Sequence, residues 1–302
     1  MKPSWPLLVA MFCVLPAFGC KKLETGHGSS GGRGGSGGAG GMGGAGGSGG
    51  EGGAGGASCP TGLAGPPLVL VPAPVPFCID STEVTAAQYH EWLSTEPPVP
   101  GDARCGWKAS YVPRSAGSNC TANHYEPTIE PEDPVVCVDW CDAFAYCTAA
   151  GKRLCGAIGG GPTPYATYSD AMKDEWTFAC SAGGARTYPY SNSFNANLCR
   201  GDLYDGVEGD GDVDEASNVK SISACQGGYI GIYDMSGNVW EWHDACNEDS
   251  TEPDASKHRC KVRGGSFWDG EVSLSCTASN VAAWTRASFY KNVGFRCCTD
   301  AL

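Results

Sequence analysis

The segment between residues 205 and 215 concentrates acidic side chains that could bind a cation. Its carboxylates belong to Asp205, Glu208, Asp210, Asp212, Asp214 and Glu215. A hard cation such as calcium takes about six to eight oxygen ligands, which such a loop can supply. The spacing is not that of an EF-hand, because the sixth residue counted from Asp210 is Glu215 rather than glycine. The sequence predicts a calcium site here, with a solvated acidic loop as the alternative.

The number and spacing of the cysteines indicate disulfide bonds. Of the 18 cysteines, Cys13 and Cys20 fall in the first 20 residues, which leaves 16. No Cys-x-x-Cys pair occurs and Cys297 is adjacent to Cys298, so the spacing of zinc fingers is absent. An even number of cysteines in an exported chain favours a disulfide framework over a reduced cytosolic protein. Which cysteines pair cannot be read from the sequence.

Other catalytic arrangements are not visible. The histidines, at positions 27, 90, 124, 243 and 258, form no His-x3-His-x-Glu motif of the kind that holds non-haem iron. Ser266 lies in Gly-Gly-Ser-Phe rather than in the Gly-x-Ser-x-Gly turn of serine hydrolases. His243 is followed by Asp244, and we interpret the two as a structural pair rather than a catalytic dyad.

The first 20 residues are typical of a bacterial export signal with a lipidation site. An apolar stretch at residues 7–18 is too short to span a bilayer but long enough for the core of a signal peptide. The segment Ala17-Phe18-Gly19-Cys20 resembles a lipobox, although Ala17 stands where leucine is usual. We predict that Cys20 is lipidated and becomes the mature N-terminus. Ordinary secretion is the alternative.

A glycine-rich segment separates this signal from the rest of the chain. From His27 to Ser58 the residues are nearly all glycine, with serine and alanine, which cannot bury apolar surface. A random coil of this length reaches on the order of 30 Å, enough to hold a folded domain away from a membrane. We therefore divide the chain into a signal peptide with lipobox (1–20), a flexible tether (21–58) and one folded domain (59–302).

The formal net charge of −13 restricts the partners of this protein. It argues against nucleic acid and against anionic membrane surfaces, and beyond Lys21-Lys22 no basic cluster occurs. Contact with a membrane is therefore expected through the lipid anchor alone. This predicts a location in the cell envelope, at the outer membrane or the cell surface.

Local patterns predict only short elements in the folded part. We expect a strand at 76–80, a helix begun by the capping box of Thr85 and Gln88, a second helix from Asp139 to Gly151, and a third from Ser169 through Trp176. Between Tyr190 and Val239 little regular pattern is visible, and disulfides or bound calcium would have to hold such loops. These short elements among glycine- and proline-rich connections favour an irregular α+β fold.

Several blocks of the folded part follow the order of one family. They read FCID with EVT (77–80 and 83–85), PVVCVDWCD (134–142), GKRL (151–154), GIYDMSGNVWEW (231–242), RGGSF (263–267) and GFR (294–296). In these blocks the chain resembles the formylglycine-generating enzyme (sulfatase-modifying factor) family. The resemblance implies that family's irregular α+β fold, an elaborated C-type-lectin-like architecture. It also implies that residues 156–167 are an insertion, which we expect a Cys155–Cys180 disulfide to close.

The resemblance implies two calcium sites. The first maps onto Asn197, the carbonyl of Leu198, and Asp210 or Asp212 in the acidic loop. The second lies within the block at 231–242. There Asp234 and Glu241 would supply carboxylate oxygens, and Gly237 and Val239 would supply carbonyl oxygens.

The resemblance also implies a copper site, which this sequence does not retain. Active members of the family carry two cysteines five residues apart just after the RGGS-aromatic block, and these bind Cu(I), which prefers thiolates. The matching positions here are Asp269 and Leu274. The nearest thiol is Cys276, two residues out of register, and Cys260, Cys297 and Cys298 are equally suited to pair with it. We therefore expect structural calcium and no copper.

Two functions remain after the sequence analysis. The first is a diverged, calcium-stabilised surface module that binds a peptide or a glycan in the cleft where the family binds substrate. The second is a formylglycine-generating oxidase that acts on a cysteine of exported proteins and uses Cys276 as its catalytic thiol. The sequence leaves open whether the protein is an enzyme. Complete pairing of the 16 cysteines would exclude the second function.

Overall fold

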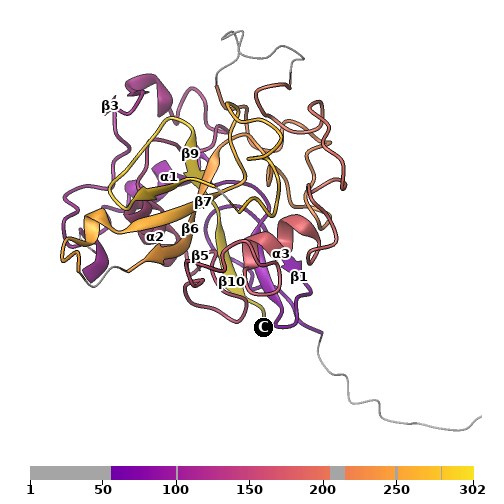
Figure 1. Cartoon of the computed structure of the whole chain (residues 1–302). Coiled ribbons are helices and arrows are strands. Elements are labelled where there is room, and N and C mark those ends of the chain that lie inside the picture. Colours follow the sequence, from indigo (N-terminus) through magenta and orange to yellow (C-terminus); the bar gives the residue numbers. More distant parts are fainter. Residues whose placement is uncertain (1–55, 100, 205–214, 249–250, 280) are drawn as a thin grey trace, which may run out of the picture. The chain divides into compact units, whose positions relative to one another are not determined.

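The computed structural model describes residues 56–99, 101–204, 215–248, 251–279 and 281–302 (Figure 1). The predicted signal peptide with Cys20, nearly all of the tether, and the acidic residues from Asp205 to Asp214 lie outside the described residues. Within the described ranges, no helix is long and apolar enough to cross a membrane.

A four-stranded antiparallel sheet brings the beginning and the end of the folded part together. Its strand order is β1 (Leu68–Val71), β2 (Phe77–Asp80), β10 (Cys297–Asp300) and β5 (Arg153–Leu154). All four residues of β2 are buried, as expected for an interior strand covered on both faces. The strand predicted at 76–80 is therefore confirmed, one residue shorter.

A second four-stranded sheet brings two of the sequence blocks side by side. Its order is β8 (Ala283–Thr285), β7 (Arg259–Arg263), β6 (Trp240–Asn247) and β9 (Val293–Phe295). Strand β6 pairs antiparallel with β7, with Glu241 opposite Arg263, and parallel with β9. The block at 231–242 and the block at 263–267 therefore meet at one end of this sheet. A small hairpin joins β3 (Ala116–Gly117) and β4 (Cys120–Thr121).

The first two helices begin where their capping residues predict. Helix α1 (Ala86–Leu93) has Thr85 as N-cap, and the reciprocal bonds between Thr85 and Gln88 form the predicted capping box. Helix α2 (Trp140–Ala149) has Asp139 as N-cap, and Gly151 adopts a φ of 71° just beyond its end. Such a left-handed residue is the usual end of a helix, and glycine adopts it without steric cost.

The third helix begins later than predicted. Helix α3 spans Glu175–Ser181 and is capped by Asp174, whose carboxylate accepts from the Thr177 amide. The prediction from Ser169 through Trp176 was wrong in its bounds, because Asp174 provides a better-placed cap than Ser169. Three short 3-10 helices, η1 (Ala103–Cys105), η2 (Ala122–His124) and η3 (Ala255–Lys257), lie in the connections.

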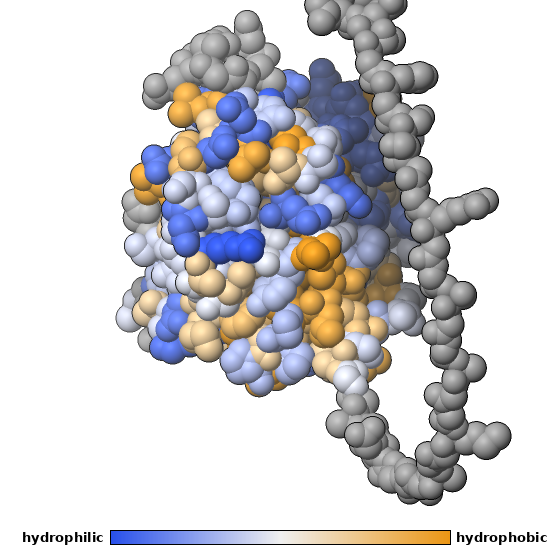
Figure 2. Space-filling view, turned by 90° about the vertical axis from the view of Figure 1, so that its right-hand side faces the viewer, coloured by the Kyte–Doolittle hydropathy of each residue, from blue (hydrophilic) through white to orange (hydrophobic). Residues whose placement is uncertain are grey.

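Aromatic side chains fill the core between α1, α2 and the second sheet. Tyr89 of α1 stacks on Tyr146 of α2 with ring centroids 5.6 Å apart, and both rings contact Phe295 of β9. The indole groups of Trp140 and Trp242 are fully buried and donate to the backbone carbonyls of His243 and Val138. On the face shown in Figure 2, apolar residues gather in patches between polar ones.

Eight disulfides join all 16 cysteines of the folded part. The pairs are Cys59–Cys78, Cys105–Cys141, Cys120–Cys137, Cys147–Cys297, Cys155–Cys298, Cys180–Cys276, Cys199–Cys225 and Cys246–Cys260. The predicted Cys155–Cys180 bond was wrong. Strand β5 pairs with β10, which places Cys155 beside Cys298, while α3 carries Cys180 to Cys276. Consecutive residues of a strand face opposite ways, so the adjacent Cys297 and Cys298 reach different partners.

Candidate functional site

The turn after β7 holds a buried serine in a hydrogen-bonded cluster. Gly264 and Gly265 have φ values of 93° and 75°, which favour glycine, and they turn the chain into Ser266. The Ser266 hydroxyl donates to Asp269 Oδ2 at 2.6 Å, and the Ser266 amide donates to the same oxygen at 3.0 Å. Asn292 donates to the serine oxygen at 3.0 Å. Asp269, at the first copper position, is therefore engaged within the protein.

The second copper position is filled by a packed alkyl group. Leu274 is 2% exposed. Its side chain covers three glycines, since a Cβ added at Gly201 or Gly265 would lie 2.5 or 2.9 Å from a Leu274 methyl carbon, and one at Gly237 3.3 Å away. Leu274 thus holds together three segments distant in sequence, which is a packing role.

The remaining candidate thiol is not free. Cys276 is bonded to Cys180, with both residues fully buried. The backbone carbonyl of Cys276 accepts a hydrogen bond from the Arg263 guanidinium. Every described cysteine is paired, so no thiolate is available to Cu(I) in the described part of the chain. The residues at this site therefore do not fit a copper centre.

The block at 231–242 forms a tight turn with one of its predicted calcium ligands at each end. Asp234 and Asn238 have φ values of 59° and Gly237 one of 81°, so three residues in this turn are left-handed. Asp234 accepts from the amide of Lys220 at 2.5 Å. Both oxygens of Glu241 accept from Arg296, each at 2.7 Å, and one also accepts from Trp176 at 2.8 Å. The Glu241 side chain is therefore neutralised by an arginine.

Glu83 is a third carboxylate at this turn, and the calcium prediction did not include it. It is fully buried, and its Oε1 accepts from Asn238 at 3.0 Å. Its Oε2 has no hydrogen-bond partner and lies 3.9 Å from Arg296. Burial and then the neighbouring Asp234 raise the pKa of Glu83 well above its ordinary value. Burial, and then the charge of Glu241, raise the pKa of Asp234 to about 6.

The buried carboxylates around this turn carry negative charge that a hard cation could offset. Three buried carboxylates, Glu83, Asp234 and Glu241, face a single guanidinium, and a cation beside Glu83 and Asp234 would offset the excess negative charge. In the described residues, no three acidic, histidine or cysteine side chains converge enough to hold a metal by themselves. Backbone carbonyls, such as those expected of Gly237 and Val239, would have to complete the shell. The EVT block at 83–85 is the sequence signal that could have pointed to Glu83.

Only half of the first predicted calcium site can be placed. Asn197 is exposed and Leu198 is partly buried in the segment that leads to Cys199. Asp210 and Asp212 lie outside the described residues. The segment does reach the block at 231–242, because the carbonyl of Arg200 accepts from the Asn238 amide at 2.7 Å.

A polar pocket of about 300 Å³ opens beside the hydrogen-bonded cluster of Ser266, Asp269 and Asn292. Phe267 and Lys291, neighbours in sequence of Ser266 and Asn292, line one side. Four carboxylates are also part of its lining, those of Glu126, Glu130, Asp133 and Glu215. Burial and then a hydrogen bond with Glu130 raise the pKa of Asp133 to about 7. Of the residues that line this pocket, only Glu215 was predicted from the sequence as a possible ligand-binding group, in the acidic loop.

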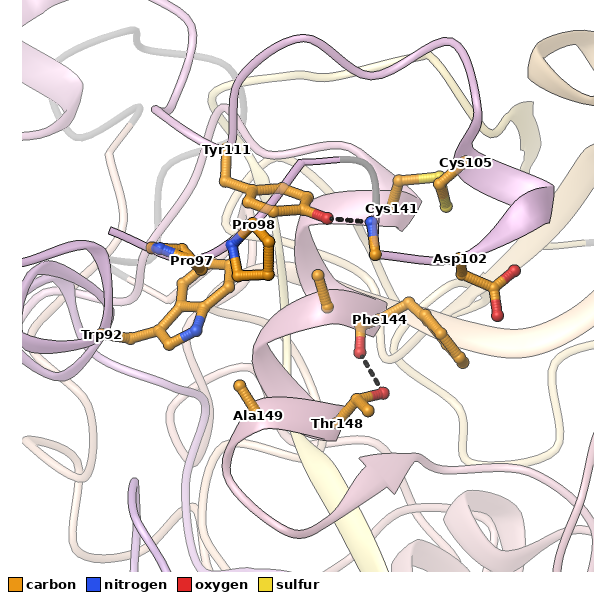
Figure 3. A pocket seen from close by; sticks show the side chains of 12 residues that line it. Trp92, Pro97, Pro98, Asp102, Cys105, Tyr111, Cys141, Phe144, Thr148 and Ala149 are labelled. Carbon is orange, nitrogen blue, oxygen red and sulfur yellow. Dashed lines mark hydrogen bonds between the residues drawn. A yellow bond between two sulfur atoms is a disulfide. The ribbon is translucent and has the colours of Figure 1, made fainter. Parts of the chain in front are cut away.

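A second pocket, of about 180 Å³, is apolar and lies apart from the turn (Figure 3). Trp92, Tyr111 and Phe144 form its walls, between the end of α1 and the outer face of α2. The Tyr111 hydroxyl accepts from the Gly101 amide, and the Thr148 hydroxyl donates to the Phe144 carbonyl, so these polar groups are satisfied within the protein.

Other predicted roles resolve into structural contacts. His243 does not pair with Asp244; its Nε2 lies 2.5 Å from Asp174 Oδ2, and both residues are fully buried. Arg263 is likewise buried and donates to Thr177, Cys276 and Ala278. The interpretation of His243 as structural stands, with Asp174 rather than Asp244 as its partner.

Comparison with known proteins assigns the fold to a family. The model of the sulfatase-modifying factor enzyme 1-like domain matches residues 58–301, so the chain belongs to this family. The inactive C-alpha-formylglycine-generating enzyme 2 of Bos taurus is 34% identical over 179 residues, covering 56% of this chain and 51% of the relative. The formylglycine-generating enzyme of Thermomonospora curvata is 31% identical over 216 residues, covering 65% and 62%.

Two solved structures are also similar. PvdO from Pseudomonas aeruginosa matches with a TM-score of 0.48 and 20% identity, over 74% of this chain and 80% of that one. CarF matches with a TM-score of 0.46 and 20% identity, over 74% and 86%. The chain spans about half the length of the first mammalian relatives it matches. The irregular, disulfide-rich α+β fold is the one expected from the sequence blocks.

Proposed function

We propose that this protein is a non-catalytic member of the family that binds a ligand where active members bind substrate. The observation that carries the proposal is the state of the three positions that copper chemistry would use. Asp269 is bonded to Ser266, Leu274 is packed over glycines, and Cys276 is held in a disulfide. None of the three can present a thiolate, while the surrounding framework is intact.

The polar pocket beside Ser266 is our candidate for the ligand site. It is lined by charged and aromatic groups from segments around residues 121–136, 215–216, 267 and 291, so a ligand would contact several parts of the fold at once. A peptide or a glycan is the ligand class we propose. The carboxylates favour a peptide with basic side chains, because opposite charges attract across such a pocket.

The same proposal includes bound calcium and export. We assign the calcium ligands at the turn to Glu83 and Asp234 with the carbonyls of Gly237 and Val239, since Glu241 is neutralised by Arg296. The lipid anchor at Cys20 would hold the domain in the cell envelope. The ion would have a structural role, because it would compensate buried charge rather than contact the ligand pocket.

The experiment that tests binding screens the purified chain against peptide and glycan arrays, with titration calorimetry of each hit. A hit at the pocket should weaken at least tenfold in Glu130→Gln, while Glu96→Gln, an exposed carboxylate that does not line the pocket, should bind like the wild type. Hits unaffected by Glu130→Gln would show that binding occurs elsewhere.

A formylglycine-generating oxidase is the second function considered; the pairing of all 16 cysteines of the folded part argues against it, and a direct assay tests this. A cysteine-containing sulfatase peptide is incubated with the protein, with and without copper, and the product is analysed by mass spectrometry. We expect no aldehyde in either condition. Aldehyde formed by the wild type and lost in Cys276→Ser would reject the binding-module proposal.

A further inference from the structure

A buried lysine lies between two aspartates at the start of α2. Lys108 Nζ is 2.7 Å from Asp139 Oδ2 and 2.5 Å from Asp142 Oδ1. The three side chains are between 0 and 1% exposed. An amine and a carboxyl group that lie this close together and are buried from solvent can condense to an amide.

The helix cap fixes the orientation of both carboxyl groups. Asp139 Oδ1 accepts from the Asp142 amide at 3.1 Å, and Asp142 Oδ2 accepts from the Asp139 amide at 2.8 Å. Each carboxyl group therefore uses one oxygen for the capping box and turns the other to Lys108. Neither side chain can rotate away without breaking the cap.

The lysine is fixed as firmly from the other side. The Lys108 amide donates to the carbonyl of Cys105, and Cys105 is bonded to Cys141, between the two aspartates (Figure 3 shows this disulfide). The reacting groups are thus held together by the fold, which replaces a bimolecular encounter and can raise a rate by many orders of magnitude.

The surroundings exclude water and favour the uncharged acid. The rings of Trp107 and Tyr111 lie 5.6 and 5.9 Å from Lys108 Nζ. Burial, and then the charge of Asp139, raise the pKa of Asp142 well above its ordinary value. A protonated carboxyl group is the form that an amine attacks, whereas a carboxylate repels the attack. Of the two aspartates, Asp142 is therefore the electrophile and Asp139 the base.

We propose that Lys108 and Asp142 form an intramolecular amide bond, with Asp139 as the proton carrier. Asp139 takes a proton from the Lys108 ammonium, and the neutral Nζ attacks Cγ of protonated Asp142. The new bond is Nζ–Cγ, and the bond that breaks is between Cγ and the Asp142 hydroxyl oxygen. Asp139 gives its proton to this departing hydroxyl and takes another from Nζ, so one water leaves.

The reaction balances within the three side chains and needs no oxidant or cofactor. Before it, one ammonium, one carboxylate and one carboxylic acid carry zero net charge; after it, an amide, a water and a protonated Asp139 also carry zero. A buried ion pair, which is costly to desolvate, is replaced by a neutral amide. The bond would tie the loop before residue 111 to α2 in addition to the Cys105–Cys141 disulfide. This proposal is independent of the ligand site.

Mass spectrometry of the intact, non-reduced protein tests the bond. The wild type should weigh one water less than the chain with its eight disulfides. After reduction, trypsin should fail to cut after Lys108, and a peptide with Lys108 joined to Asp142 should appear. A full mass together with cleavage after Lys108 would overturn the proposal.

Two variants act as controls. Lys108→Arg keeps the buried cation but has no nucleophilic amine near neutral pH, so it should have full mass. Asp139→Asn keeps an acceptor for the helix cap but cannot take up and release a proton near neutral pH, so the amine and Asp142 should remain unlinked. A water loss that persists in Lys108→Arg would show that it arises elsewhere and reject the proposal. A cross-link to Asp139 would overturn the assigned roles.

Discussion

Replacing Arg296 by methionine should be among the most destabilising single changes at the turn of residues 234–241. Arg296 makes two hydrogen bonds of 2.7 Å to Glu241 and donates to the carbonyls of Asp80 and Tyr233 at 3.2 and 2.9 Å. It is also the guanidinium 3.9 Å from Glu83. Its removal leaves buried carboxylates with no compensating charge. Breaking a buried pair in this way costs about 3–5 kcal/mol.

The loss should be measured by guanidinium denaturation of the non-reduced protein. For a folded part of this size, the cost corresponds to a fall in melting temperature on the order of 10 °C. The double variant Arg296→Met with Glu241→Gln should recover part of the loss, because it removes one of the stranded charges. Lys257→Met, which removes an exposed lysine 3.6 Å from its acidic partners, should change stability little.

Two outcomes would refute this reasoning. A loss below about 1 kcal/mol for Arg296→Met would place it in the range of ordinary surface changes, and the turn would then not depend on charge compensation. Equal stability of the single and double variants would show that Glu241 is not the group that Arg296 neutralises. Measuring both in EDTA and in excess calcium separates the effect of the arginine from that of a bound ion.

Three further predictions concern calcium, pH and the anchor. EDTA should lower the melting temperature and added calcium should restore it, whereas magnesium should not, because it keeps its bound waters. The variant Glu83→Gln should abolish most of this shift. Identical melting curves in EDTA and in excess calcium would reject the site. The pKa of Asp234 is about 6 in the folded state against an ordinary 3.8, so the folded state binds the proton more tightly than the unfolded state. Without calcium, the free energy of unfolding should therefore decrease as the pH rises from about 4 to about 6. Asp234→Asn should remove that part of the slope in urea titrations, and an unchanged slope would assign it to other groups. Cys20→Ala should move the protein from the detergent phase to the aqueous phase in Triton X-114 partitioning, and equal partitioning would exclude the anchor.

Local chemistry determined what could be predicted about the elements. The capping residues Thr85 and Asp139 form their hydrogen bonds with residues three positions further along the chain, so their roles can be predicted without knowing the fold. The strand at β2 and the blocks that define the family are equally local. The loss of the copper cysteines is also a property of the sequence, because Asp269 and Leu274 cannot become thiolates in any fold.

The tertiary structure decided which distant residues meet. Cys155 pairs with Cys298 rather than Cys180 because β5 lies beside β10, and no local pattern encodes that strand order. Glu83 joins the turn at Asp234, and His243 finds Asp174, for the same reason. Lys108 looks like an ordinary surface lysine in the sequence. Only the packing of its loop on α2 removes it from water and places its amine between two carboxyl groups, which is what changes its chemistry.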